Sequence, residues 1–99
     1  MITETAHLTI DPARAAEFEQ AVAQASVVLR AAEGCRSMEL ERLVEDPAGY
    51  QLRVDWESVD HHKRLFRQSE GFTRWRALAG PFFAAPPVVD YSEAVERFF

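Results

Sequence analysis

Three segments of the chain alternate between apolar and polar residues with a period of two, and this pattern constrains the fold more than any other feature. They are residues 2–10, 35–44 and 50–57. Successive side chains of a strand point to opposite faces, so each segment is expected to form a strand with one face on a core. In the first segment, one face carries Ile2, Glu4, Ala6, Leu8 and Ile10. The turn sequence EDPAG separates the other two segments, which predicts a hairpin.

Between the first two of these segments, apolar residues recur at the helical spacing of three and four. Asp11 is a natural N-cap, Pro12 suits the first helical position, and Gly34 is placed to end the helix. The apolar positions are Ala15, Phe18, Val22, Ala25 and Leu29. The spacing predicts an amphipathic helix with this stripe on the core.

Residues 58–79 return to the helical period. Ser58 or Asp60 can cap this helix, and a break is expected near Gly71. Its inward positions are Val59, His62, Leu65, Phe66, Phe72, Trp75 and Leu78. A short β-branched run at residues 88–93 predicts a last strand. The order β-α-β-β-α-β predicts an α+β fold, a ferredoxin-like four-stranded antiparallel sheet with helices on one face.

At 99 residues, the chain is expected to fold as one domain, residues 1–99. Its 11 basic and 16 acidic residues give a formal net charge of −5. This balance disfavours nucleic acid and an anionic membrane as partners, because phosphate contacts need a concentrated basic surface. No apolar run approaches the roughly 18 residues that span a bilayer, and the first ten residues lack the pattern of a secretion signal. We therefore expect a cytoplasmic protein.

The second face of the predicted sheet is polar and carries Thr3, Thr5, His7, Gln51, Arg53 and Asp55. We interpret Arg53 and Asp55 as an ion pair and place His7 at an interface between two sheets. Two such faces could be buried against each other if their charges were mutually satisfied. Apolar residues left over by a small core, including Phe98 and Phe99, would also favour association. We therefore expect a homodimer.

The run WESVDHHKRLFRQSEGFTRW, residues 56–75, resembles the antibiotic biosynthesis monooxygenase (ABM) family of dimeric α+β barrel proteins. In that family a Trp typically ends the third strand, a polar capping segment follows, and a His and a Ser-x-x-Phe lie in the next helical region. The matching positions are Trp56, Glu57, His62, Ser69 and Phe72. The resemblance implies a ferredoxin-like monomer, a dimer formed by packing sheet against sheet, and a pocket between each sheet and its helices.

Enzymes of that family oxidise quinols, anthrones or related aromatic polyketides with dioxygen and without a prosthetic group. The resemblance implies a monooxygenase of this kind, acting on a quinol, phenol or anthrone-like aromatic with no cofactor. Haem-degrading members carry Asn, Trp and His about where this chain has Ala6, Phe66 and Arg76, which disfavours haem. A non-catalytic small-molecule-binding or structural dimer is the alternative, and an isomerase or decarboxylase is a third, because one fold hosts many reactions.

His62 is the candidate catalytic base, because it lies on the apolar helical stripe and histidine has an ordinary pKa of about 6.5. The alternative is a core histidine bonded to a backbone carbonyl. The residues expected around a ligand are Trp56, Phe66, Phe72, Trp75 and Tyr50. Trp56 and Trp75 are the better candidates, because their indole N–H groups could donate to a ligand oxygen, whereas a structural role in the core is the favoured interpretation of Phe66 and Phe72. The three histidines lack metal-ligand spacing, so no metal is expected.

Overall fold

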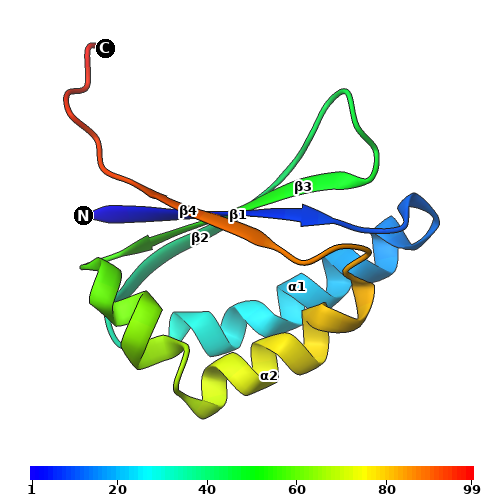
Figure 1. The fold of residues 1–99 in the computed structure, drawn as a ribbon, viewed down its shortest axis with the longest axis horizontal. Coiled ribbons are helices and arrows are strands. Elements are labelled where there is room, and N and C mark those ends of the chain that lie inside the picture. Colours follow the sequence, from blue (N-terminus) through cyan, green and yellow to red (C-terminus); the bar gives the residue numbers. More distant parts are fainter.

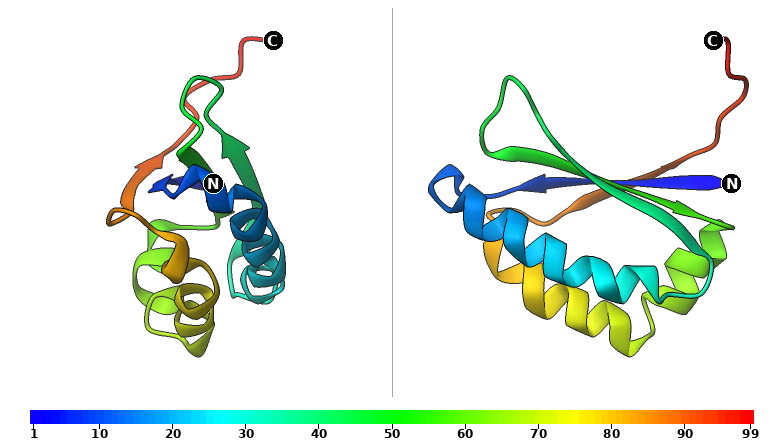
Figure 2. Two further views of the ribbon diagram at one scale, coloured as in Figure 1. Left: turned by 90° about the vertical axis from the view of Figure 1, so that its right-hand side faces the viewer. Right: turned by 180° about the vertical axis from the view of Figure 1, so that it is seen from behind.

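In the computed structural model, which describes residues 1–99, an antiparallel sheet is covered on one face by helices (Figure 1). The strands are β1 (Ile2–Thr9), β2 (Cys35–Arg42), β3 (Gly49–Trp56) and β4 (Val88–Ser92), in the spatial order β2-β3-β1-β4. The two α-helices, α1 (Ala15–Arg30) and α2 (Glu70–Ala79), pack side by side on the same face of the sheet (Figure 2). The predicted α+β, ferredoxin-like fold is confirmed. None of the helices has the length and apolar composition needed to cross a membrane.

The central strand β1 decides which residues meet on the helix-covered face. It pairs with β3 along its whole length and with β4 on its other side. Glu4 lies opposite Val54 of β3 and Tyr91 of β4 in this register. Residues directly opposite each other in a sheet share a face, so the three side chains point the same way as the buried Ala6 and Leu8. A carboxyl group therefore stands on the core face of the sheet.

The predicted apolar stripe of α1 is buried except for Ala15, which is partly buried, and Phe18 and Ala25 are fully enclosed. Asp11 accepts the N–H of Ala13 at 3.0 Å and so caps the short 3-10 helix η1 (Pro12–Arg14) that leads into α1. After α1, Gly34 has a φ of +81° and redirects the chain into β2. This left-handed conformation is one that glycine adopts without steric penalty.

The helical segment after β3 begins as a π-helix, η2 (His61–Phe66). The N–H of Arg67 donates to the carbonyl of His62, five residues earlier, at 3.1 Å. Such wide turns are rare and often occur at functional sites. The predicted cap Ser58 accepts the N–H of His61 at 3.3 Å, whereas Asp60 makes no capping hydrogen bond.

The helical segment is interrupted at residues 67–69, before the predicted position at Gly71. Ser69 is the reason, because its side chain serves both helical pieces. The hydroxyl donates to the carbonyl of Phe66 at 2.6 Å and accepts the N–H of Phe72 at 3.3 Å, which makes Ser69 the N-cap of α2. Gly71 lies within the first turn of α2 instead.

The outer face of the sheet is polar, as predicted, but Arg53 and Asp55 contact other side chains instead of each other. Arg53 approaches Glu41 at 3.7 Å, and Asp55 accepts hydrogen bonds from Thr3 at 2.6 Å and Ser37 at 2.9 Å. Within one chain, Arg53 and Asp55 therefore do not pair with each other, and an ion pair of these residues at an interface stays a prediction. The two residues are on one strand, and the neighbouring strands offer each of them a closer partner.

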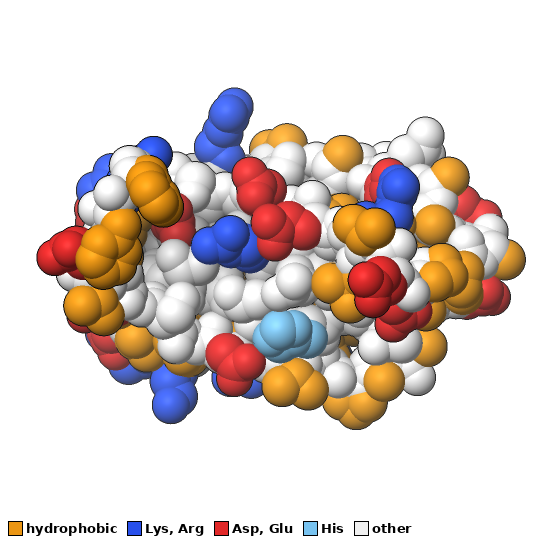
Figure 3. Space-filling view, turned by 90° about the horizontal axis from the view of Figure 1, so that it is seen from above, with side chains coloured by type: hydrophobic (Ala, Val, Ile, Leu, Met, Phe, Trp, Pro, Cys, Tyr) orange, Lys and Arg blue, Asp and Glu red, His pale blue; other side chains and the backbone are white.

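Seen from outside, charged side chains of both signs and a histidine gather near the centre of this face, with hydrophobic groups toward its two ends (Figure 3). His7 is half-exposed and contacts Asp90 of β4 at 3.1 Å. Beyond β4 the chain leaves the sheet, and Phe98 and Phe99 are exposed (Figure 1). Their packing against a second copy of the chain stays a prediction.

We expect Gly34→Ala to lower the free energy of unfolding by about 2–5 kcal/mol, from backbone strain at positive φ and from overpacking. A Cβ at Gly34 would overlap the imidazole of His61. The double variant Gly34→Ala/His61→Ala should recover most of the overpacking part, although the Cβ of residue 61 remains 2.9 Å from the added Cβ, and none of the backbone part. Urea unfolding of the variants measures both.

Gly80→Ala is the matched control, because Gly80 has an ordinary helical φ of −55° and its nearest neighbouring atom would lie 3.7 Å from a Cβ. This change should leave stability equal or slightly higher. Equal stabilities for Gly34→Ala and the native chain would contradict the described turn.

Candidate functional site

A cavity of about 260 Å³ lies between the sheet and the second helical segment. Four residues proposed from the sequence line it: His62, Phe66, Phe72 and Trp75. Ala6, Leu8 and Leu52 contribute apolar surface from the sheet. The side chains at the cavity that can carry a charge, apart from His62, are Glu4, Arg67 and Arg76. The cavity is thus an apolar space with a few polar groups, the composition typical of small-molecule sites.

The aromatic wall is held by contacts between its own rings. Phe66 and Phe72 meet edge to face with their centroids 5.8 Å apart. The guanidinium groups of Arg67 and Arg76 lie 5.7 Å and 5.8 Å from the centroid of the Phe72 ring. Trp75 is buried, and its indole N–H has no hydrogen-bond acceptor within the protein. Its N–H group is therefore left without an internal partner beside the cavity.

Trp56 does not line the cavity but stands directly behind it. It is fully buried, and its ring centroid lies 5.3 Å from that of His62 and 5.4 Å from that of Phe66. Its indole N–H donates to Oε1 of Glu4 at 2.9 Å. Trp56 thus supports the polar end of the cavity instead of facing a ligand.

Tyr50 lies elsewhere in the core, away from the other proposed residues. Its ring packs edge to face against Phe18 at 5.0 Å, and its hydroxyl donates to Glu19 at 2.5 Å. Burial raises the pKa of Tyr50, and the hydrogen bond to Glu19 adds to that rise. The structure therefore gives Tyr50 a place between the sheet and α1 and does not bring it to the cavity.

Glu4 is the main feature of the site that sequence reasoning missed. Its side chain is almost completely buried, with 6% of the residue exposed. Oε1 accepts the Trp56 N–H and lies 3.3 Å from Nε2 of His62, while Oε2 has no hydrogen-bond partner in the protein. The available signal was that Glu4 is the one charged residue on the inward face of residues 2–10.

His62 is enclosed by protein groups on both sides of its ring. Nδ1 lies 2.6 Å from the hydroxyl of Tyr91, and Nε2 faces Glu4. Tyr91 was also missed, because its approach depends on the pairing of β4 with β1. The structure thus forms a line of three titratable groups, Glu4, His62 and Tyr91, from three separate elements.

Burial is the largest influence on the pKa values of these three groups. Burial raises the pKa of Glu4 to about 7, against the hydrogen bond from Trp56 and the positive charge of Arg67, which both lower it. Burial and the charge of Arg67 lower the pKa of His62 to about 4, and burial raises the pKa of Tyr91. His62 is therefore neutral at pH 7. The 3.3 Å approach of Nε2 to Oε1 is therefore a contact between a neutral imidazole and a carboxyl group that titrates near neutrality, not an ion pair.

His61 points away from the cavity. Its Nδ1 lies 2.8 Å from the hydroxyl of Ser58, and its Nε2 lies 3.6 Å from Glu57. No three side chains of His, Cys, Asp or Glu converge as a metal site would require.

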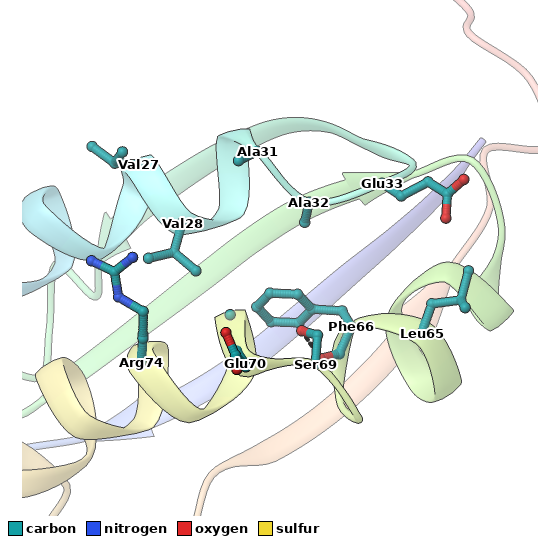
Figure 4. A pocket seen from close by; sticks show the side chains of 11 residues that line it. Val27, Val28, Ala31, Ala32, Glu33, Leu65, Phe66, Ser69, Glu70 and Arg74 are labelled. Atoms are coloured by element: carbon teal, nitrogen blue, oxygen red, sulfur yellow. Dashed lines mark hydrogen bonds between the residues drawn. The ribbon is translucent and has the colours of Figure 1, made fainter.

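A second hollow, of about 510 Å³, lies between the end of α1 and the start of α2 (Figure 4). Val28 and Phe66 point toward it, with Glu70 and Arg74 on the α2 side (Figure 4). All of its charged lining residues are exposed to solvent. It therefore lacks the buried titratable group that distinguishes the smaller cavity, although Phe66 borders both.

Comparison with known proteins agrees with the fold and places the chain in a family. Residues 1–78 match the family model described as antibiotic biosynthesis monooxygenase. The chain belongs to this family. Uncharacterized protein YczJ of Bacillus subtilis (strain 168) is 32% identical over 95 residues, which cover 96% of this chain and 100% of that protein.

Solved structures of ABM proteins are similar throughout the chain. A candidate antibiotic biosynthesis monooxygenase from Bordetella bronchiseptica is 45% identical with a TM-score of 0.93, covering 96% of this chain and 97% of that one. A mutant of SnoaB, a cofactor-independent oxygenase from Streptomyces nogalater, has 18% identity and a TM-score of 0.76 over 98% of this chain and 95% of that one. The likeness to SnoaB is one of fold alone.

We expect Glu4 and His62 to give this ABM chain opposite dependences of stability on pH. The raised pKa of Glu4 contributes stability that is fully present below pH 4.5 and is lost as the pH rises through about 7. The lowered pKa of His62 contributes stability that is present above pH 6.5 and is lost as the pH falls through about 4.

Glu4→Gln, which keeps only the histidine, should therefore gain stability as the pH rises from 4 to 6.5. His62→Gln, which keeps only the carboxyl group, should lose stability as the pH rises from 4.5 to 7. Each slope approaches about 1.4 kcal/mol per pH unit at most. Urea unfolding across this range measures them, with the exposed Glu39→Gln as control. Slopes of the same sign would contradict the assignment.

Proposed function

We propose that the chain is a cofactor-independent monooxygenase that oxidises a quinol, phenol or anthrone-like aromatic with dioxygen. The observation that carries the proposal is an apolar cavity that ends on the buried pair of Glu4 and His62. Membership of the ABM family supports it, and so does the likeness of fold to SnoaB, which is a cofactor-independent oxygenase.

This chemistry makes three demands on a site. The substrate supplies the electrons, so a group must take its hydroxyl proton and leave an electron-rich anion that reacts with dioxygen. The anion needs an enclosure that limits water and a donor near its oxygen. In the overall reaction the substrate loses two hydrogens and gains one oxygen, and the second oxygen atom leaves as water. No external reductant enters this balance.

The residues at the cavity can meet these demands. Phe66, Phe72 and Trp75 supply the apolar enclosure for a flat ring, and Arg67 supplies positive charge for the anion. The buried pair of Glu4 and His62 supplies the groups for proton transfer, with His62 as a neutral imidazole. Trp56 holds the polar end in place from behind.

The size of the cavity favours small substrates. Sites for drug-sized ligands usually enclose about 300–1,000 Å³. At about 260 Å³, this cavity lies just below that range. We propose that one- and two-ring phenols and quinols fit it better than larger anthrone-like molecules.

A second proposal, a non-catalytic small-molecule-binding dimer of the same fold, is favoured by one specific observation. Both ring nitrogens of His62 already face protein groups, Tyr91 on one side and Glu4 on the other. A histidine with both nitrogens occupied has the environment of a structural residue. The two proposals differ in whether dioxygen is consumed.

The first experiment is dioxygen uptake by the purified protein with a panel of reduced naphthoquinols, naphthols and anthrones, with a chelator present. We expect uptake well above the spontaneous rate, reduced by about 10²-fold or more in His62→Ala, the usual loss when proton transfer fails. His61→Ala is the matched control, because that residue lies outside the cavity. Uptake at the background rate for the whole panel would favour the binding dimer.

We also propose that two copies pack through the outer face of the sheet, because this face is polar, carries charges of both signs and is not covered by helices. Thr5 lies opposite Arg53 and Asp90 near the middle of the face. Thr5→Arg should weaken the dimer, whereas Thr73→Arg, on the exposed side of α2, should not. Light scattering with size exclusion measures the mass. A monomer for the unmodified chain would overturn this proposal.

A further inference from the structure

The two oxygens of the buried Glu4 carboxyl have different surroundings. Oε1 is taken up by the indole N–H of Trp56 and by the imidazole of His62. Oε2 has no hydrogen-bond partner, although every fully enclosed polar side-chain atom of the chain has one. Oε2 is therefore not fully enclosed, and the residue lines the cavity. The side chain is more than nine-tenths buried, so this oxygen is open to the cavity and to little else.

His62 offers no comparable free atom. A ligand hydroxyl could reach Nδ1 only by replacing the hydroxyl of Tyr91, which lies 2.6 Å away. It could reach Nε2 only by separating the imidazole from Glu4. The first approach gives up a buried hydrogen bond and the second a close buried contact, whereas contact with Oε2 adds a hydrogen bond without such a loss.

We infer that Glu4, through Oε2, is the group that binds the hydroxyl of a phenolic or quinol ligand and takes its proton, and that His62 is a positioning residue. This inference rests on the proposed function. The ligand O–H bond breaks, its electron pair stays on the ligand oxygen, and the proton moves to Oε2. No oxidant takes part in this step.

The same carboxyl group can complete the reaction. After dioxygen bonds to the ring carbon of the anion, Glu4 returns its proton to the peroxide. It then takes the hydrogen of that carbon as a proton while the O–O bond breaks and hydroxide leaves. The hydroxide takes this second proton and leaves as water, which restores the carboxylate. Hydrogens and oxygens therefore balance with one carboxyl group as the carrier.

The surroundings of Glu4 suit this role. Burial holds its pKa at about 7, and an acid–base group works best when its pKa lies near the working pH. The charged and titratable groups around it are His62 and Arg67 from the helical segment, Tyr91 from β4 and Cys35 from β2. Of these only Arg67 is charged at pH 8, and its positive charge favours the carboxylate.

Binding measured without dioxygen tests the contact separately from the chemistry. The probes are 1-naphthol and its methyl ether, which differ only in the hydroxyl hydrogen that Oε2 would accept. At pH 8 we expect the unmodified chain to prefer the naphthol by about tenfold or more, the range for a hydrogen bond to a charged group. The preference should decrease as the pH falls below 7, because Glu4 takes up a proton.

Glu4→Gln keeps an oxygen for the Trp56 N–H and should reduce the preference to a few-fold at most, with no dependence on pH. Glu39→Gln, an exposed change on β2, should keep the full preference. His62→Gln should retain most of it, because Oε2 remains. A preference that survives in Glu4→Gln but disappears in His62→Gln would overturn the inference, and so would equal binding of both probes by the unmodified chain.

Kinetics separate this inference from the proposed function. The rate of dioxygen uptake should rise with pH through an apparent pKa of about 7, and this rise should be absent in Glu4→Gln. Uptake that is unchanged in Glu4→Gln would disprove the role of Glu4 and leave the oxygenase standing. A naphthol preference that depends on Glu4, without any uptake, would disprove the oxygenase and keep Glu4 as the hydroxyl-binding group.

Discussion

A carboxyl group buried on the central strand is the constraint on which this end of the molecule depends. An isolated carboxylate in an apolar interior is strongly unfavourable, so it must be neutralised, hydrogen-bonded or both. Glu4 receives a hydrogen bond from Trp56 at the end of β3 and contacts His62 of η2. These contacts satisfy one oxygen, while burial raises the pKa of the carboxyl group to about 7. Three elements are thereby fixed to each other at one end of the cavity.

The local structures around this group have consistent roles. The antiparallel register brings Tyr91 opposite Glu4, and the π-helical turn of η2 places His62 and Phe66 on the same side of the segment, with their rings inclined by 27°. Ser69 then ends this turn and starts α2, which carries Phe72 and Trp75 to the cavity. The aromatic wall and the polar end therefore come from one continuous stretch of chain that crosses the face of the sheet.

The sequence predicted most of the fold because period-two alternation and helical spacing report directly on which side of an element is buried. The strands, α1 and the order of elements followed from this pattern, and so did the placement of His62, Phe66, Phe72 and Trp75 near one another. The pattern does not show which side chains contact each other. The pairing of Asp55 with Thr3 depends on strand register, and the contact of Tyr91 with His62 depends on a strand far along the chain. Glu4 was visible on the inward face, but only its neighbours show what it does.

The ring of Phe66 has a consequence for the volumes on either side of it. It borders both the 260 Å³ cavity and the 510 Å³ hollow between the two helices. The Phe66 ring thus separates the two spaces, and a rotation that enlarges one of them makes the other smaller. The closely packed rings of Trp56 and Phe72 limit that rotation. The shape of the 260 Å³ cavity therefore depends partly on how closely α1 and α2 pack around the 510 Å³ hollow.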